Sequence, residues 1–85
     1  MPEICRFAGI VIYMYFSDHA PPHFHARYRQ FEITVTIEDG VVKGEFPKKA
    51  LRQVLKWYDQ HKRELITNWK LAQASQALKK INPLR

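Results

Sequence analysis

The sequence has little cysteine, little glycine and no long apolar run. Cys5 is the only cysteine among 85 residues, which excludes an internal disulfide and fits a reducing cytoplasm. No apolar stretch approaches the roughly 18 residues of a membrane span. The first residues, with Glu3 and without a basic cluster or a small-residue cleavage site, do not resemble a signal peptide. We therefore expect a cytoplasmic protein without a membrane segment.

The length and composition predict a single domain over residues 1–85. Hydrophobic residues make up 46% of the chain and aromatic residues 13%, which is enough for a modest core. The pattern of residues divides this domain into a strand region (about 4–46), a helical region (about 47–74) and a loose tail (75–85).

Positive charge is concentrated in the C-terminal half. The net charge is +6, yet residues 1–46 are slightly acidic and residues 47–85 hold ten of the 14 lysines and arginines. This asymmetry favours an anionic partner, RNA or DNA first, although a solvated helix face would look the same. The candidate nucleic-acid-binding residues are Arg27, Arg29, Lys49, Arg52, Lys56, Arg63 and Lys70.

The stretch Asp18–Arg29 holds three of the four histidines, two adjacent prolines and two arginines. The prolines favour extended backbone before a strand that begins at His23. Side chains in a strand alternate between its two faces. His23, His25 and Arg27 would therefore point one way, and Phe24, Ala26 and Tyr28 the other.

The following segments read as strands joined by short turns. With a two-residue turn at Arg29–Gln30, apolar residues oppose apolar ones and His25 opposes Thr34. A second two-residue turn at Asp39–Gly40 would place Ile37 opposite Val42. The result is an apolar face (Phe24, Ala26, Tyr28, Phe31, Ile33, Val35, Ile37, Val42, Phe46) and a polar face (His23, His25, Arg27, Glu32, Thr34, Thr36, Lys43, Glu45).

Two further features complete the predicted fold. The segment 9–16 is apolar on both sides, as in a strand with a neighbour on each side, and Ile4–Phe7 either extends it or forms its own strand. Pro47 opens a helix, and a break near Asp59–His61 divides the helical region because an uninterrupted helix would place a lysine beside the apolar stripe. We predict an α+β domain: an antiparallel meander of about four strands, then two C-terminal helices packed on one face.

The histidine stretch supports two kinds of chemistry. Cleavage of RNA needs a base, an acid and a phosphate-binding cation, which His23, His25 and Arg27 would supply. A zinc or other transition-metal site would use His19, His23 and His25, with Asp18 as the alternative to His19. Both readings predict a hydrolase, either histidine-based or metal-dependent.

A third reading is an interaction module. The first strand is apolar on both sides, so one side is available to a partner protein or to a second copy in a homodimer. Trp57 and Trp69 are the large aromatic residues that would anchor such an interface, but helical spacing places them more naturally in the core.

The order of residues from Ile4 to His25, which ends in Asp18-His19-Ala20-Pro21-Pro22-His23-Phe24-His25, is similar to that of a family of small bacterial proteins, domain-of-unknown-function family 4160. The later Trp57, Trp69 and the tail residues 79–84 also match. The resemblance implies a component of a toxin–antitoxin-like module, because members often lie beside a second small gene. Such a component would contact nucleic acid, a partner protein or both, and the resemblance supplies no catalytic residues.

Overall fold

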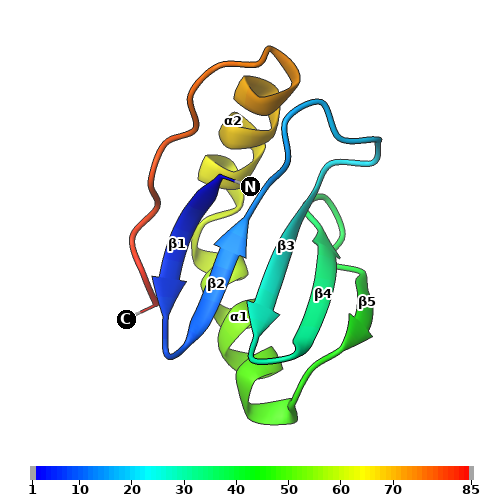
Figure 1. The fold of residues 1–85 in the computed structure, drawn as a ribbon, viewed down its shortest axis with the longest axis vertical. Coiled ribbons are helices and arrows are strands. Elements are labelled where there is room, and N and C mark those ends of the chain that lie inside the picture. Colours follow the sequence, from blue (N-terminus) through cyan, green and yellow to red (C-terminus); the bar gives the residue numbers. More distant parts are fainter. Residues whose placement is uncertain (1, 85) are drawn as a thin grey trace.

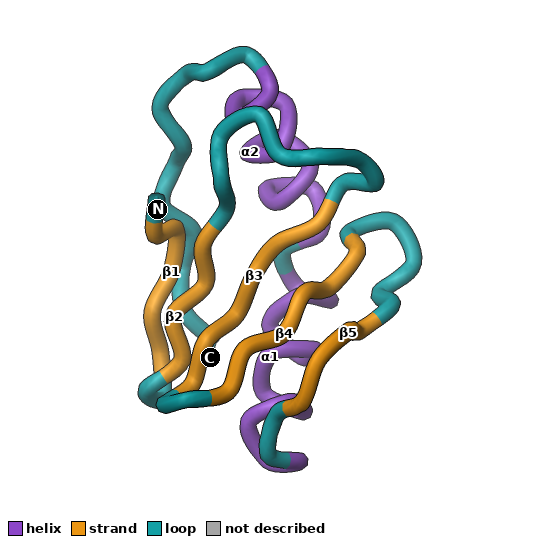
Figure 2. The backbone as a smooth tube through the Cα atoms, turned by 45° about the vertical axis from the view of Figure 1, so that its right-hand side comes forward, coloured by secondary structure: helices purple, strands orange, loops and turns teal. Residues whose placement is uncertain are grey.

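The computed structural model describes residues 2–84. Its elements are β1 (Glu3–Phe7), β2 (Ile10–Tyr13), β3 (His23–Tyr28), β4 (Phe31–Thr36), β5 (Val42–Glu45), α1 (Lys48–Gln60) and α2 (Lys62–Gln73). The strands form one antiparallel sheet in chain order, and both helices lie on one side of it (Figures 1 and 2). The predicted α+β meander is confirmed, with five strands because Glu3–Phe7 pairs as its own strand. Neither helix in the described range is long and apolar enough to cross a membrane.

The first predicted hairpin has the predicted register. His25 pairs with Thr34, and Tyr28 pairs with Phe31 across the turn at Arg29 and Gln30. Arg29 itself adopts a positive φ of 54°, a conformation that non-glycine residues seldom take. The two faces of the hairpin are therefore sorted by the alternation of the sequence, even though the turn residues are unusual.

The second predicted hairpin is wrong by two residues. Val42 pairs with Val35 rather than with Ile37, so the connection runs through residues 37–41 instead of a two-residue turn. Ile37 leaves the ladder because its N–H donates to the carbonyl of Pro22 and its carbonyl accepts from the Tyr58 hydroxyl. A shift by two preserves which residues share a face, so the polar and apolar faces remain as predicted.

The helices cover the apolar face. Trp57 of α1 is fully buried, with its ring centroid 5.8 Å from that of Phe24 and 5.9 Å from that of Phe7. Trp69 of α2 is only 9% exposed. The helix break falls at His61, within the predicted interval, and both tryptophans belong to the core.

The tail after α2 is extended and tied to the domain, where the sequence predicted a loose segment. It passes beside β1 (orange to red in Figure 1), and the N–H of Ile81 donates to the Ile4 carbonyl at 2.8 Å. The buried Asn68 amide bonds both the N–H and the carbonyl of Lys79. Trp57 Nε1 donates to the carbonyl of Asn82. These hydrogen-bond partners lie outside the tail, so the sequence pattern of the tail alone does not predict its path.

Candidate metal centre

The polar face of the sheet is built as rows of side chains across the strands. Tyr13, His25, Thr34 and Lys43 are successive partners from β2 to β5 and form one row. A neighbouring row contains the pair of His23 and Thr36. Since Phe24 faces α1, the two histidines that flank it in β3 face the opposite side, away from α1.

The loop formed by residues 14–22 folds over one end of the polar face. The amide of Gln73 donates to the backbone carbonyl of Asp18 at 3.0 Å, and the N–H of Ser17 donates to the carbonyl of Ala72. These two bonds attach the loop to the C-terminal end of α2. The loop thereby covers the first half of β3, and the side chain of His23 is only 7% exposed and that of His25 only 13%.

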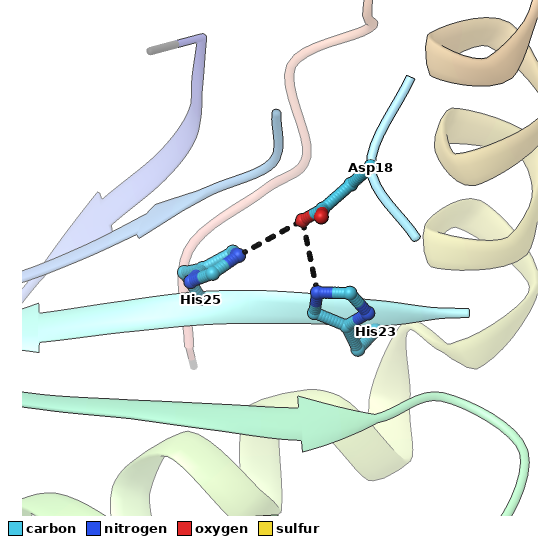
Figure 3. Close-up of side chains that lie close together, drawn as sticks. All are labelled: Asp18, His23 and His25. Carbon is cyan, nitrogen blue, oxygen red and sulfur yellow. Dashed lines mark hydrogen bonds and ion pairs between the residues drawn. The ribbon is translucent and has the colours of Figure 1, made fainter. Parts of the chain in front are cut away.

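Asp18 lies between the two histidine rings (Figure 3). Its Oδ2 is 3.0 Å from Nε2 of His23 and 3.3 Å from Nε2 of His25. Burial raises the pKa of Asp18, but the backbone N–H of His19, the ring of His25 and the charge of His23 together lower it below its usual value. Asp18 is therefore a carboxylate at neutral pH.

The His23 ring is oriented by a bond to the backbone. Its Nδ1 lies 2.7 Å from the carbonyl oxygen of Pro21, and a carbonyl can only accept, so Nδ1 carries the proton. In the neutral ring, Nε2 then presents a lone pair to the Asp18 carboxylate, which also can only accept. A metal ion between these two atoms would accept an electron pair from each of them.

The His25 ring is held by two tyrosines and a carboxylate. It stacks on Tyr13 at 5.0 Å, and Tyr15 meets its edge at 4.8 Å. Its Nδ1 is 3.8 Å from Oε2 of Glu32, which also accepts a hydrogen bond from the Tyr13 hydroxyl. Burial, followed by the bond to Glu32, raises the pKa of Tyr13, so its phenol remains a neutral donor. Nε2 of His25 is thus turned toward Asp18, like that of His23.

The three converging atoms match the requirements of a metal ion. Two imidazole nitrogens and one carboxylate oxygen, all within 4.8 Å of one another, are a donor set that zinc and iron sites use. Bonds of about 2.0–2.2 Å at tetrahedral angles separate the donor atoms by about 3.3–3.6 Å. The separation of 3.3 Å from Asp18 to His25 lies in that range, and the separation of 3.0 Å from Asp18 to His23 lies a few tenths of an ångström below it. The carbonyl and carboxylate behind the rings are the usual outer partners of metal-binding histidines.

The structure brings together His23, His25 and Asp18, the residue that the sequence offered as the alternative to His19. The side chain of His19 is 83% exposed, with its Nδ1 2.9 Å from the other oxygen of Asp18, so it stands at the rim of the cluster. Asp18 takes the central place because a carboxylate has two oxygens and can face both histidine rings and His19 at once.

The predicted cations do not gather around this cluster. Arg27 lies over the Tyr13 ring, 5.5 Å from its centroid, in the row beyond His25. Arg29 occupies the first hairpin turn. The remaining predicted nucleic-acid contacts are exposed side chains of α1 and α2: Lys49, Arg52, Lys56, Arg63 and Lys70. Lys49, Arg52 and Lys56 of α1 lie across the sheet from the histidines, whereas α2 reaches the cluster through Trp69, whose ring centroid is 5.3 Å from that of His23.

A cavity opens beside the two histidines. Its volume is about 130 Å³, and it is lined by the three histidines 19, 23 and 25 together with Pro21, Thr34, Thr36 and Lys43. Thr34 and Lys43 were assigned to the polar face from the sequence but not to a site. The signal that could have found them was the row through His25, which the corrected β4–β5 register completes.

The comparisons with known proteins identify a family without a described chemistry. The family model described as a domain of unknown function, DUF4160, matches residues 9–70. No curated protein matches the sequence, and no solved structure does. The matched range contains Asp18, His23 and His25 together with most of both helices, so the chemistry has to be argued from these side chains.

Proposed function

The chain belongs to the DUF4160 family, and we propose that it is a metal-dependent hydrolase with a divalent transition-metal ion, zinc first, on Asp18, His23 and His25. One observation carries this proposal: both Nε2 atoms point at the same carboxylate oxygen, while Nδ1 of His23 is bonded to the Pro21 carbonyl and Nδ1 of His25 faces Glu32 at 3.8 Å. Two imidazolium rings with centroids only 5.1 Å apart in a poorly hydrated site would repel each other. A single metal ion satisfies the same three atoms without that repulsion.

Three protein ligands leave a coordination position for water. A bound zinc ion lowers the pKa of such a water to about 7 and makes it a nucleophile at neutral pH. The cavity beside His23 and His25 gives a substrate group access to that position. His19, exposed at the rim, is placed to carry a proton from the site to solvent. The metal-free alternative, with His23 and His25 as base and acid and Arg27 as phosphate clamp, requires both Nε2 atoms to be free of metal.

Metal analysis of protein prepared without a histidine tag tests the proposal. We expect about one equivalent of zinc in the wild type and at least tenfold weaker zinc binding in Asp18→Asn and His25→Ala. His61→Ala is the matched control because this histidine pairs with Glu64 at the helix junction, away from the cluster. Less than about a tenth of an equivalent under saturating zinc would exclude the metal centre and leave the histidine-based mechanism.

A second candidate function, nucleic-acid contact, is supported by the helical layer. Lys49, Arg52 and Lys56 are all exposed at helical spacing on α1, and a cavity of about 270 Å³ beside α2 is lined in part by Arg63, Lys79 and Lys80. Such a surface binds phosphates without reading sequence. Gel shifts with RNA and DNA at two salt concentrations test it, and affinity that does not fall with salt or with Arg52→Ala plus Lys56→Ala would count against it.

We extend the proposal, on the resemblance alone, to a role in a toxin–antitoxin-like module in the cytoplasm. The partner would be the protein from the adjacent gene or a second copy of this chain. Co-purification with the product of the neighbouring gene, together with the molar mass of the isolated chain in solution, tests this. A chain that stays monomeric and retains no neighbour-encoded protein would argue against both partners.

A further inference from the structure

Thr34 of β4 and Lys43 of β5 lie beside the candidate metal centre on the polar face. Thr34 is the cross-strand partner of His25, and Lys43 is the partner of Thr34. Neighbouring strands are about 4.8 Å apart, so Thr34 is one strand from the histidine and Lys43 is two. Both side chains line the same cavity as His23 and His25.

The polar atoms of these two side chains are available to a ligand. Within residues 2–84, neither Thr34 Oγ1 nor Lys43 Nζ has a hydrogen-bond or ion-pair partner. The neighbouring Thr36 differs, since its hydroxyl donates to Asp39 and accepts from the N–H of Val41. A hydroxyl and an ammonium in a cavity beside a metal centre are suited to an anionic group with several oxygens.

The size of the cavity limits what it can hold. About 130 Å³ is well below the roughly 300–1,000 Å³ of pockets that enclose a whole small molecule. The cavity therefore takes one group of a substrate whose remaining parts lie outside. Local charge narrows the choice further. Among the described residues that line the cavity, Lys43 is the charged side chain and none is a carboxylate. A divalent ion on the neighbouring Asp18 would add to this positive charge, so the cavity suits an anionic group.

We propose that Thr34 and Lys43 bind the phosphate of a phosphodiester substrate next to the metal ion. The proposal rests on the hydrolase function proposed above and names its substrate class. Water activated by an ion held on Asp18, His23 and His25 would attack phosphorus, and the bond from phosphorus to the leaving oxygen would break. One proton of the water ends on that leaving oxygen, so the products are a phosphomonoester and an alcohol. Lys43 and Thr34 neutralise and orient the non-bridging oxygens during this step.

Binding of bis(p-nitrophenyl) phosphate to the zinc-loaded protein tests the assignment. We expect Lys43→Ala to raise the Kd about tenfold and Thr34→Val to raise it a few-fold, because charge-assisted hydrogen bonds are the stronger kind. Lys43→Arg should restore most of the affinity. Lys56→Ala is the control, since this exposed lysine belongs to α1 on the other side of the sheet.

The outcomes separate this inference from the proposed function. Normal zinc content in Lys43→Ala with an unchanged Kd for the diester would overturn the phosphate site alone. A wild-type protein that binds no zinc would overturn the hydrolase itself. Repeating the titration with a short single-stranded RNA identifies the source of the diester. An equal loss of affinity in Lys43→Ala indicates a nucleic acid, and a loss confined to the small diester indicates a low-molecular-weight substrate.

Discussion

The two faces of the sheet use the same strands for different purposes. On the side of the helices, Phe24 and Ala26 of β3 are fully buried among apolar neighbours. On the other side, the intervening His25 and the preceding His23 are nearly as well covered, but by a loop that brings a carboxylate. One strand thus provides the centre of the core and two of the three candidate metal ligands, at alternate positions.

The difference teaches that burial alone does not separate core from site in a small domain. The apolar face stabilises the fold in proportion to the area removed from water. The polar face tolerates burial only because each group has a partner: His23 has Pro21 and Asp18, and His25 has Asp18 and Glu32. Substitutions on the two faces should therefore differ in kind, with stability affected on one and metal binding on the other.

The largest expected effect is on the apolar face, at Trp57. Trp57→Ala should lower the free energy of unfolding by about 3–5 kcal/mol because it removes the side chain that contacts Phe24 and Phe7. Urea denaturation followed by circular dichroism measures the loss. In buffer without urea, where the variant remains folded, its zinc stoichiometry should equal that of the wild type. Asp18→Asn, in contrast, should bind less zinc.

Two milder variants serve as controls in case Trp57→Ala does not fold. Trp57→Phe keeps a ring but loses the bond from Nε1 to the Asn82 carbonyl, so we expect a loss of about 1–2 kcal/mol. Val41→Ala changes a side chain that is 47% exposed and should stay within about 0.5 kcal/mol of the wild type. Equal losses in the three variants would mean that Trp57 does not anchor the helices to the sheet.

An intermediate effect is expected at Gly44 of β5, where the backbones of two strands approach closely. Its φ is +105°, and a Cβ at this position would lie 2.5 Å from the carbonyl oxygen of Glu32. Gly44→Ala should therefore cost roughly 1–3 kcal/mol. The residue beside it is Lys43, so the same variant should weaken binding of the phosphodiester probe while zinc content is kept. A variant with wild-type stability would show that β5 pairs with β4 differently from the register described above.

The sequence predicted the properties of the sheet that depend on local alternation. The pairing of His25 with Thr34 followed from matching apolar to apolar across one turn. The pairing of Val42 was missed because Ile37 is drawn out of the ladder by the Tyr58 hydroxyl, from a helix 21 positions later. The path of the tail was missed for the same reason, since Asn68 holds it by a contact that no spacing reveals.

The candidate metal centre likewise has one part that the sequence predicted and one part that it did not. That His23 and His25 share a face is a consequence of their spacing by two residues. That Asp18 rather than His19 lies between them depends on how the loop closes, and the loop is attached through Gln73, 55 positions away. The spacing of the histidines thus predicted a candidate metal site on this face, whereas the choice between Asp18 and His19 as its third ligand required the tertiary structure.

The smallest expected effect is a pH dependence of stability that comes from Cys5, on the apolar face. Cys5 is 5% exposed within the core cluster, and burial raises the pKa of its thiol above the ordinary value. The folded protein then holds this proton more tightly than the unfolded chain. Its contribution to stability is complete below the ordinary thiol pKa of about 8.5 and declines as the pH rises through that value.

Urea denaturation of the wild type and of Cys5→Ala at pH 7 and pH 10 tests this. The difference between the two urea midpoints should be slightly smaller in Cys5→Ala than in the wild type. Rapid reaction of the native thiol with a disulfide reagent at pH 8 would contradict this, because it would place Cys5 outside the dry side of the sheet.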